Sequence, residues 1–283
     1  MTPLSGPDCA TPAAVARTLY RLRERIPLVH SITNLVVTNS TANALLAIGA
    51  SPAMLEAAEE TDEFARIADA LVINLGTMTA DRARGMHAAA AAATQAGTPW
   101  VLDPVAVGAV SYRSGVAVSL LAHAPHAIRG NASEILALDA LSAAGGANNA
   151  AGGRGVDSAH APELALDAAK RLARRTGAAV TVSGAIDLVT NGDRVIAIRN
   201  GHPMMPRVTG LGCTATALIG ACLAVEPDRL AASAHGMVMI GLAGELAAER
   251  ARGPGSLQME LLDALYRLDE ATLLARATFG PPP

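Results

Sequence analysis

Residues Arg207-Val-Thr-Gly-Leu-Gly-Cys213-Thr-Ala-Thr-Ala-Leu-Ile-Gly-Ala-Cys222 combine a glycine turn with a long run of small and apolar residues. Gly210 and Gly212 allow a tight turn with uncovered N–H groups, and the composition of 213–225 predicts a buried helix. The N-terminus of such a helix attracts anions such as phosphate, because its N–H groups are unpaired and partly positive. There we expect the pKa of the Cys213 thiol to fall below its free value. The alternative is a loop that only caps a core helix, with Cys213 as a small hydrophobic residue.

The composition excludes several classes of protein. The chain has 283 residues, of which 51% are hydrophobic and only 2% aromatic, so a large core must consist mainly of aliphatic side chains. Charged residues make up 17% and the net charge is −3, which predicts neither a nucleic-acid-binding nor a membrane-binding surface. Lys170 is the only lysine and no phosphate-binding P-loop motif surrounds it, which excludes P-loop chemistry.

The cysteines indicate a reducing compartment. Cys9, Cys213 and Cys222 have neither metal-ligand spacing nor an even number that could form a disulfide framework. No charged segment followed by an apolar run marks a signal peptide, and the apolar run 213–225 is too short to cross a bilayer. We therefore predict a cytoplasmic protein.

Apolar strands that alternate with helices predict an α/β fold with a mostly parallel sheet covered on both faces. The expected strands are 28–34, 71–75, 100–102, 127–129 and 179–182, followed by a hairpin that turns at Asn191-Gly192. Parallel sheets bind ligands at the carboxyl ends of their strands. Five polar residues are expected there: Asn34, Asn74, Asp103, Arg129 and Ser183.

Three segments are expected to have little regular structure. Residues 142–162 are rich in Gly, Ala and Asn, which predicts a mobile loop inside a single domain spanning 1–283. Residues 51–54 are expected to form a tight loop after a helix that ends at Gly49. The terminal segments 1–10 and 279–283 are expected to fray.

Several strand-end segments resemble those of the hydroxyethylthiazole kinase family. The resemblance covers about residues 27–225 and rests on seven segments: Val29-His-Ser-Ile-Thr-Asn34, Gly49-Ala-Ser-Pro-Ala-Met54, Ile73-Asn-Leu-Gly-Thr77, Leu102-Asp-Pro-Val-Ala-Val-Gly108, Ile128-Arg-Gly-Asn-Ala-Ser-Glu-Ile135, Gly155-Val-Asp-Ser158 and Pro206-Arg-Val-Thr-Gly-Leu-Gly-Cys213. It implies a ribokinase-like three-layer α/β sandwich without a separate lid domain, and a homotrimer with active sites between subunits. The implied reaction transfers the γ-phosphoryl group of ATP to the primary alcohol of 4-methyl-5-(2-hydroxyethyl)thiazole, for thiazole salvage in thiamine biosynthesis.

The resemblance implies three substrate-binding residues. Met54 is expected to contact the thiazole ring across a subunit boundary, Asn34 to hydrogen-bond near the substrate, and Gly210 to present its backbone to the alcohol. From the residues alone, each has a simpler structural alternative. Met54 can be core filler, Asn34 can satisfy a local turn, and Gly210 can serve turn geometry only.

The resemblance also implies residues for ATP and Mg²⁺. Arg129 is expected to pair with the phosphates, which suits its planar fork of donors, although an exposed ion pair is the alternative. Ser183 replaces the usual threonine of the family and keeps its hydroxyl for the nucleotide. Asp103 and Glu134 are the carboxylates expected to hold Mg²⁺, directly or through water, and either can instead cap a turn or helix.

Cys213 occupies the position where related kinases place an aspartate as base. A thiol is a poor base toward an alcohol, but the loose transition state of phosphoryl transfer needs little prior deprotonation. Cys213 is therefore expected to contribute modestly to the rate.

Cys213 also argues against a pyridoxal kinase, a hydroxymethylpyrimidine kinase or an ADP-dependent dehydratase of the same fold, which usually carry aspartate there. A non-catalytic nucleotide-binding module and a dinucleotide-dependent dehydrogenase are the more distant alternatives, and the latter lacks its glycine motif after the first strand.

Overall fold

The computed structural model describes residues 9–144 and 161–281 and contains one continuous nine-stranded sheet. The strand order is β2-β1-β3-β4-β5-β6-β7-β8-β9. Neighbouring strands from β2 to β6 pair in parallel, and β7, β8 and β9 continue the sheet in antiparallel pairs. The strand bounds are β1 (Leu28–Ile32), β2 (Ser51–Ala53), β3 (Ala70–Asn74), β4 (Trp100–Asp103), β5 (Ala127–Asn131), β6 (Ala179–Ser183), β7 (Asp187–Thr190), β8 (Val195–Ile198) and β9 (Phe279–Gly280).

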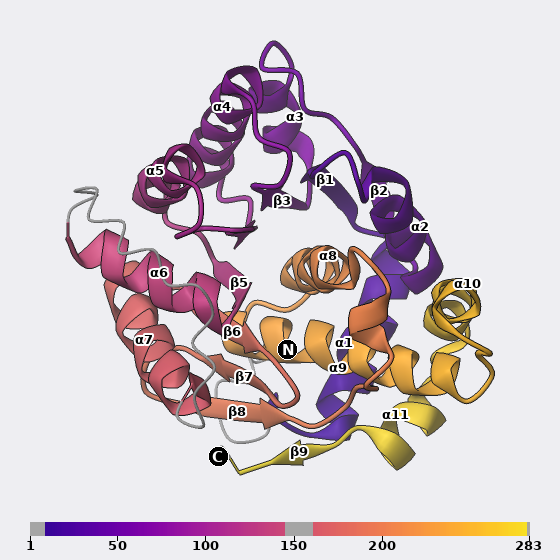
Figure 1. Cartoon of the computed structure of the whole chain (residues 1–283). Coiled ribbons are helices and arrows are strands. Elements are labelled where there is room, and N and C mark those ends of the chain that lie inside the picture. Colours follow the sequence, from indigo (N-terminus) through magenta and orange to yellow (C-terminus); the bar gives the residue numbers. More distant parts are fainter. Residues whose placement is uncertain (1–8, 145–160, 282–283) are drawn as a thin grey trace.

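Helices cover both faces of this sheet, as expected. One layer comprises α3 (Thr61–Ile67), α4 (Ala80–Ala96), α5 (Ser111–Leu120), α6 (Ala132–Ala143) and α7 (Ala161–Thr176). The other comprises α1 (Pro12–Arg25), α2 (Thr38–Ile48), α8 (Leu211–Leu223), α9 (Arg229–Ala248), α10 (Pro254–Arg267) and α11 (Glu270–Arg276). The sheet curves around α8, and the first layer lies on the outside of that curve (Figure 1). Two apolar clusters fill the spaces between the three layers, which makes the fold a three-layer α/β sandwich.

The buried helix predicted after the glycine turn is α8. Every residue of α8 from Thr214 to Leu223 is buried, and the helix packs across β1, β3, β4 and β5. Gly220 lies so close to Val72 that a Cβ would stand 2.6 Å from that side chain. Small residues therefore let α8 approach the sheet, and its N-terminus reaches the carboxyl ends of the strands.

Several predicted boundaries are corrected. Residues 51–53 form β2 rather than a loop, and Pro52 is tolerated because β2 is an edge strand. Helix α3 begins only at Thr61, and the C-terminal region forms two helices, α10 and α11. The hairpin of β7 and β8 is confirmed.

Both chain ends were predicted to fray, and this is wrong for the terminal residues that the structure describes. Cys9 is buried and its carbonyl accepts a hydrogen bond from His235 Nε2 at 2.8 Å, while Phe279 and Gly280 pair with β8. Residues 1–8 and 282–283 lie outside the described residues. The predicted loop 142–162 is shortened because α6 ends at Ala143 and α7 begins at Ala161, and 145–160 also lie outside the described residues.

Helix α9 is long and apolar enough to pass as a membrane span by length and composition. Its most apolar window is 89% buried inside the fold, where it packs on α8 and α10. A core helix passes the same test, and the burial of α9 explains its composition.

Candidate functional site

A chain of amide and carboxylate groups joins three neighbouring strand ends. Asn34 follows β1, Asn74 ends β3 and Asp103 ends β4, where Asn74 and Asp103 lie opposite each other in the register. Asn34 Nδ2 donates to Asn74 Oδ1 at 2.9 Å, and Asn74 Nδ2 donates to Asp103 Oδ2 at 2.8 Å. Asn74 Oδ1 also accepts from the Gly76 N–H at 3.0 Å. The predicted cluster of polar strand ends is therefore one connected network.

The first turns of α8 complete this network from above the sheet. Thr216 Oγ1 donates to Asp103 Oδ2 at 2.8 Å, and Asn34 Nδ2 lies 3.4 Å from Cys213 Sγ. Gly210 caps the helix with a φ of +82°, and a Cβ there would overlap the side chain of Val37. The glycine is thus required by geometry, and Cys213 and Asp103 meet around the helix start.

Asp103 is a buried carboxylate in a network of uncharged groups. Its side chain is 1% exposed, and burial raises its pKa from 3.8 to about 6. The charge of Arg129 opposes that shift, Glu134 adds to it, and the hydrogen bonds from Thr216 and Asn74 lower the pKa. The neighbours of Asp103 therefore offset its negative charge only in part, and a cation bound beside the carboxylate would be stabilised.

We expect the unfolding free energy of the metal-free protein to fall as the pH rises from about 4 to about 6. The folded state binds the Asp103 proton more tightly than the unfolded chain, so the stabilising contribution is complete below pH 3.8 and is lost above the folded pKa of about 6. Asp187, whose pKa burial also raises to about 6, acts in the same direction. Urea unfolding in a chelating buffer from pH 4 to 8 measures this dependence. A smaller slope of the unfolding free energy against pH in Asp103→Asn gives the part that Asp103 contributes.

Arg129, on β5, lies between Ser183 at the end of β6 and the start of α8. Its Nη2 donates to Ser183 Oγ at 2.7 Å, and Ser183 Oγ lies 3.3 Å from the carbonyl of Gly130. A Cβ on Gly212 would stand 2.6 Å from Arg129 Nη1, so the guanidinium packs directly on the helix turn. The predicted pair of Arg129 and Ser183 is brought together, and the absence of a side chain at Gly212 makes room for it.

Glu134 takes the capping role that the sequence offered as the alternative to metal binding. Its carboxylate accepts from the N–H of Asn131 at 2.9 Å within a capping box at the start of α6, and from the N–H of Ala106 at 2.9 Å. It therefore joins the β4–α5 loop to α6 while its charge acts on Asp103. Among the described residues, no three His, Cys, Asp or Glu side chains could hold a metal ion together. Mg²⁺ fits this set only if one or two carboxylates share it with phosphate and water.

The thiol of Cys213 has a raised pKa, which corrects the expectation of a lowered one. Burial is the largest cause and the charge of Asp103 adds to it, while hydrogen bonds from Asn74 and Asn34 and the charge of Arg129 lower the pKa. Loss of water and a neighbouring anion both disfavour a thiolate, and this outweighs the positive end of α8. Cys213 is a protonated thiol at neutral pH.

Met54 lies outside this hydrogen-bonded network. It is partly exposed and follows β2, the edge strand, one strand beyond Asn34. Two residues that neighbour the predicted ones were not singled out from the sequence. Thr216 lies three positions after Cys213 on an apolar helix. A polar residue on such a helix could have indicated a role for Thr216. Asp187 accepts from the Gly184 N–H at 3.0 Å, but its approach to Arg129 depends on the fold of the hairpin.

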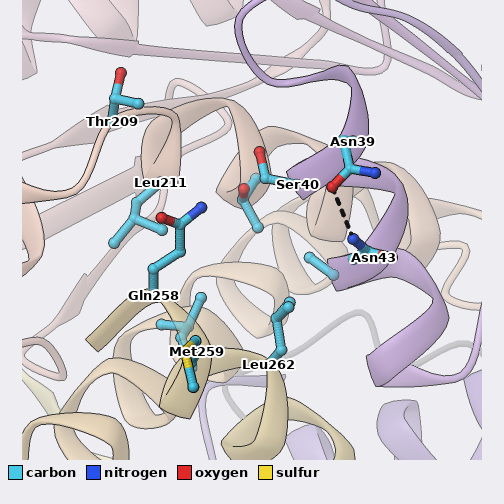
Figure 2. Close-up of a pocket in the computed structure, with 11 residues that line it drawn as sticks. Asn39, Ser40, Asn43, Thr209, Leu211, Gln258, Met259 and Leu262 are labelled. Atoms are coloured by element: carbon cyan, nitrogen blue, oxygen red, sulfur yellow. Dashed lines mark hydrogen bonds between the residues drawn. The ribbon is translucent and has the colours of Figure 1, made fainter. Parts of the chain in front are cut away.

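A cavity of about 160 Å³ lies on another side of the α8 start, between α2, α8 and α10. Figure 2 shows Asn39, Ser40, Leu211 and Met259 around it, with the Asn43–Asn39 hydrogen bond at its rim. None of the eight predicted site residues lines this cavity.

Comparison with known proteins shows one family. The model of the hydroxyethylthiazole kinase family matches residues 19–271. The chain is 65% identical over 260 residues to a hydroxyethylthiazole kinase of Granulibacter bethesdensis, covering 91% of this chain and 92% of that protein. It is 50% identical over 263 residues to one of Escherichia coli, covering 93% and 97%.

Solved structures agree with the fold. A hydroxyethylthiazole kinase protein from Pyrococcus horikoshii has a TM-score of 0.85 at 41% identity, covering 94% of this chain and 98% of that one. A ribokinase-like superfamily protein from Enterococcus faecalis has a TM-score of 0.59 at 13% identity, covering 88% and 89%. The second likeness shows the ribokinase-like fold alone.

Proposed function

The chain belongs to the hydroxyethylthiazole kinase family, and from this premise we propose how its residues carry out the reaction. The enzyme phosphorylates the primary alcohol of 4-methyl-5-(2-hydroxyethyl)thiazole with ATP, which serves thiazole salvage for thiamine biosynthesis. The observation that carries the proposal is the network that joins Asn34, Asp103 and Cys213 where α8 begins. Around this network, the thiazole alcohol, the transferred phosphate and a cation can lie within one small space.

The thiazole side consists of Asn34, Met54 and Gly210. We place the ring between Met54, at the sheet edge, and Asn34 of the same chain, instead of a Met54 that reaches across a subunit boundary. Asn34 is held by its hydrogen bond to Asn74 and by the one that it accepts from the Val36 N–H. The alcohol then points at the backbone of Gly210, which carries no side chain of its own. Holding the alcohol in line with the phosphorus supplies much of the rate enhancement in such reactions.

The nucleotide side consists of Arg129 and Ser183. The Arg129 guanidinium and the N–H groups of the first α8 turn both attract negative charge, so together they can hold the phosphate that is transferred. Ser183 orients Arg129 through the 2.7 Å hydrogen bond and can contact the nucleotide with its hydroxyl.

Asp103 and Glu134 are proposed to hold Mg²⁺, Asp103 through its buried carboxylate and Glu134 through the lone pairs that its backbone partners leave available. Bound there, Mg²⁺ would neutralise phosphate charge in the transition state. Thr216 and Asn74 keep the Asp103 carboxylate directed toward the site through their hydrogen bonds.

Replacement of Cys213 by alanine is expected to lower kcat by about 100-fold or less, at the bottom of the range for general acid–base groups. The reason is that a thiol with a raised pKa is protonated at neutral pH and accepts the alcohol proton poorly. Measuring kcat from pH 6 to 10 tests this role. The wild type should gain activity toward high pH and Cys213→Ala should lose that gain; equal profiles would leave the thiol no part in proton transfer.

We also propose a homotrimer whose sites lie between subunits. The partly exposed Met54 at the edge of the sheet supports this, because an edge can be completed by a second copy. A cytoplasmic location remains our expectation, supported by three free cysteines at positions 9, 213 and 222. Analytical ultracentrifugation of the purified chain measures the oligomeric state.

The decisive experiment is ADP release by the purified protein with Mg²⁺, ATP and hydroxyethylthiazole, with hydroxymethylpyrimidine as the alternative acceptor. Turnover with the thiazole alone is expected. Turnover with only the pyrimidine would keep the fold and overturn the specificity assigned to Met54 and Cys213. ATP binding without turnover on either acceptor would instead favour a nucleotide-binding module.

A further inference from the structure

The loop formed by residues 54–60 begins with Met54 and leads from the edge strand β2 into α3. His30, on the neighbouring strand β1, is fully buried, and its Nε2 donates to the carbonyl of Leu55 at 3.0 Å. The ring packs edge-on against Phe64 of α3, with ring centroids 5.1 Å apart. His30 therefore fixes the backbone of the residue that follows Met54, from the strand that leads to Asn34.

Arg82, in the first turn of α4, holds the same loop from the other side. Its side chain is buried, with an exposed fraction of 7%, and its guanidinium donates both to the carboxylate of Glu56 and to the carbonyl of Thr33. Thr33 directly precedes Asn34, and Glu56 comes two residues after Met54. One side chain thus connects the two segments that carry Asn34 and Met54.

The backbone of the loop also rests on α4. A Cβ on Gly85 would stand 2.8 Å from the carbonyl oxygen of Glu56, so that carbonyl packs against the helix where no side chain intervenes. Thr61 Oγ1 donates to the carbonyl of Gly85 at 3.1 Å and anchors the far end of the loop. The loop is seated on α4 at both ends, and Arg82 provides its link to β1.

We propose that Arg82, supported by His30, is a positioning residue that sets the spacing of Met54 and Asn34 and thereby the affinity for the thiazole. This inference rests on the proposed function, in which those two residues hold the substrate. An arginine suits the task because its planar fork directs donors to two acceptors in a fixed geometry, whereas the donors of a lysine ammonium rotate on a flexible stem. Both terminal nitrogens of the buried Arg82 side chain are directed to Glu56 and Thr33, so we assign Arg82 to positioning and not to phosphate binding.

The test compares KM for the thiazole, KM for ATP and kcat in Arg82→Lys, Glu56→Ala and Glu56→Gln. We expect Arg82→Lys and Glu56→Ala to raise the thiazole KM by about 10- to 100-fold, because a displacement of about 1 Å costs up to that factor. The ATP KM should stay within about twofold of the wild-type value, since Arg129 and Ser183 lie several strands away, on β5 and β6. Glu56→Gln keeps an acceptor oxygen for Arg82 and should recover most of the loss.

Arg84→Gln is the matched control, because Arg84 lies on the same helix and pairs with Asp81 in solvent, at 2.6 Å. It should match the wild type in all three constants. A purely structural role for Arg82 would raise both KM values together. Since Glu56 is 44% exposed, its variants keep the test valid even where Arg82→Lys fails to fold.

Met54→Ala separates failure of this inference from failure of the proposed site. If Met54→Ala raises the thiazole KM while Arg82→Lys and Glu56→Ala leave it unchanged, the positioning role is wrong and the substrate site stands. If Met54→Ala itself leaves the thiazole KM unchanged, the substrate site is wrong and the positioning role falls with it.

Discussion

Replacing Asp103 by asparagine is expected to lower kcat by about 100- to 1,000-fold, the loss typical of removing one preorganised electrostatic group. The substitution keeps the size of the side chain and an oxygen that can accept from Thr216, but it removes the buried negative charge that would hold the cation. The same change is expected to stabilise the metal-free protein. A shift of the Asp103 pKa from 3.8 to about 6 corresponds to about 3 kcal/mol of destabilisation at pH 7, which asparagine relieves in part.

Steady-state kinetics and urea unfolding at pH 7 on the same preparation measure both effects. Asp187→Asn is the matched control, because burial also raises the pKa of Asp187 to about 6, yet its carboxylate accepts from the backbone of Gly184. This control should gain stability and keep most of its activity. An Asp103→Asn enzyme with wild-type kcat would show that Asp103 holds no cation during turnover.

Replacing Arg129 by lysine is expected to lower kcat/KM for ATP by about 100- to 1,000-fold, even though the charge is retained. The guanidinium donates to Ser183 Oγ with Nη2 while it packs on the backbone at Gly212, and its Nε is buried without a hydrogen-bond partner in the described structure. A lysine ammonium is compact and cannot reach the hydroxyl and the helix turn with fixed geometry.

Initial rates at varied ATP and at varied thiazole distinguish the two sides of the site. Arg129→Lys should change the ATP constants and leave the thiazole KM near that of the wild type. Ser183→Ala should have a smaller effect, about tenfold or less, because it removes one neutral hydrogen bond. A lysine enzyme with normal ATP kinetics would contradict a phosphate-binding role for Arg129.

Local patterns predicted the elements that carry their own signals. The apolar strands around 71–75 and 100–102, the hairpin at Asn191-Gly192 and helix α8 are where the sequence placed them, because hydrophobic period and turn chemistry act over a few residues. The cluster of polar strand ends followed from parallel pairing, since parallel strands end at one edge of a sheet. By contrast, β2 was missed because three residues become a strand only when β1 lies beside them.

The sequence by itself determined the fold class, the glycine turn before a buried helix and the residues at the strand ends. Only the tertiary structure decided their chemical state and their spacing. The positive end of α8 is readable from its own residues. The pKa of Cys213 is raised first by burial and then by the charge of Asp103, 110 positions earlier in the chain. Likewise, only packing places the guanidinium of Arg82 between Thr33 and Glu56. Burial and long-range neighbours set pKa values and side-chain positions, and neither is encoded in any short segment.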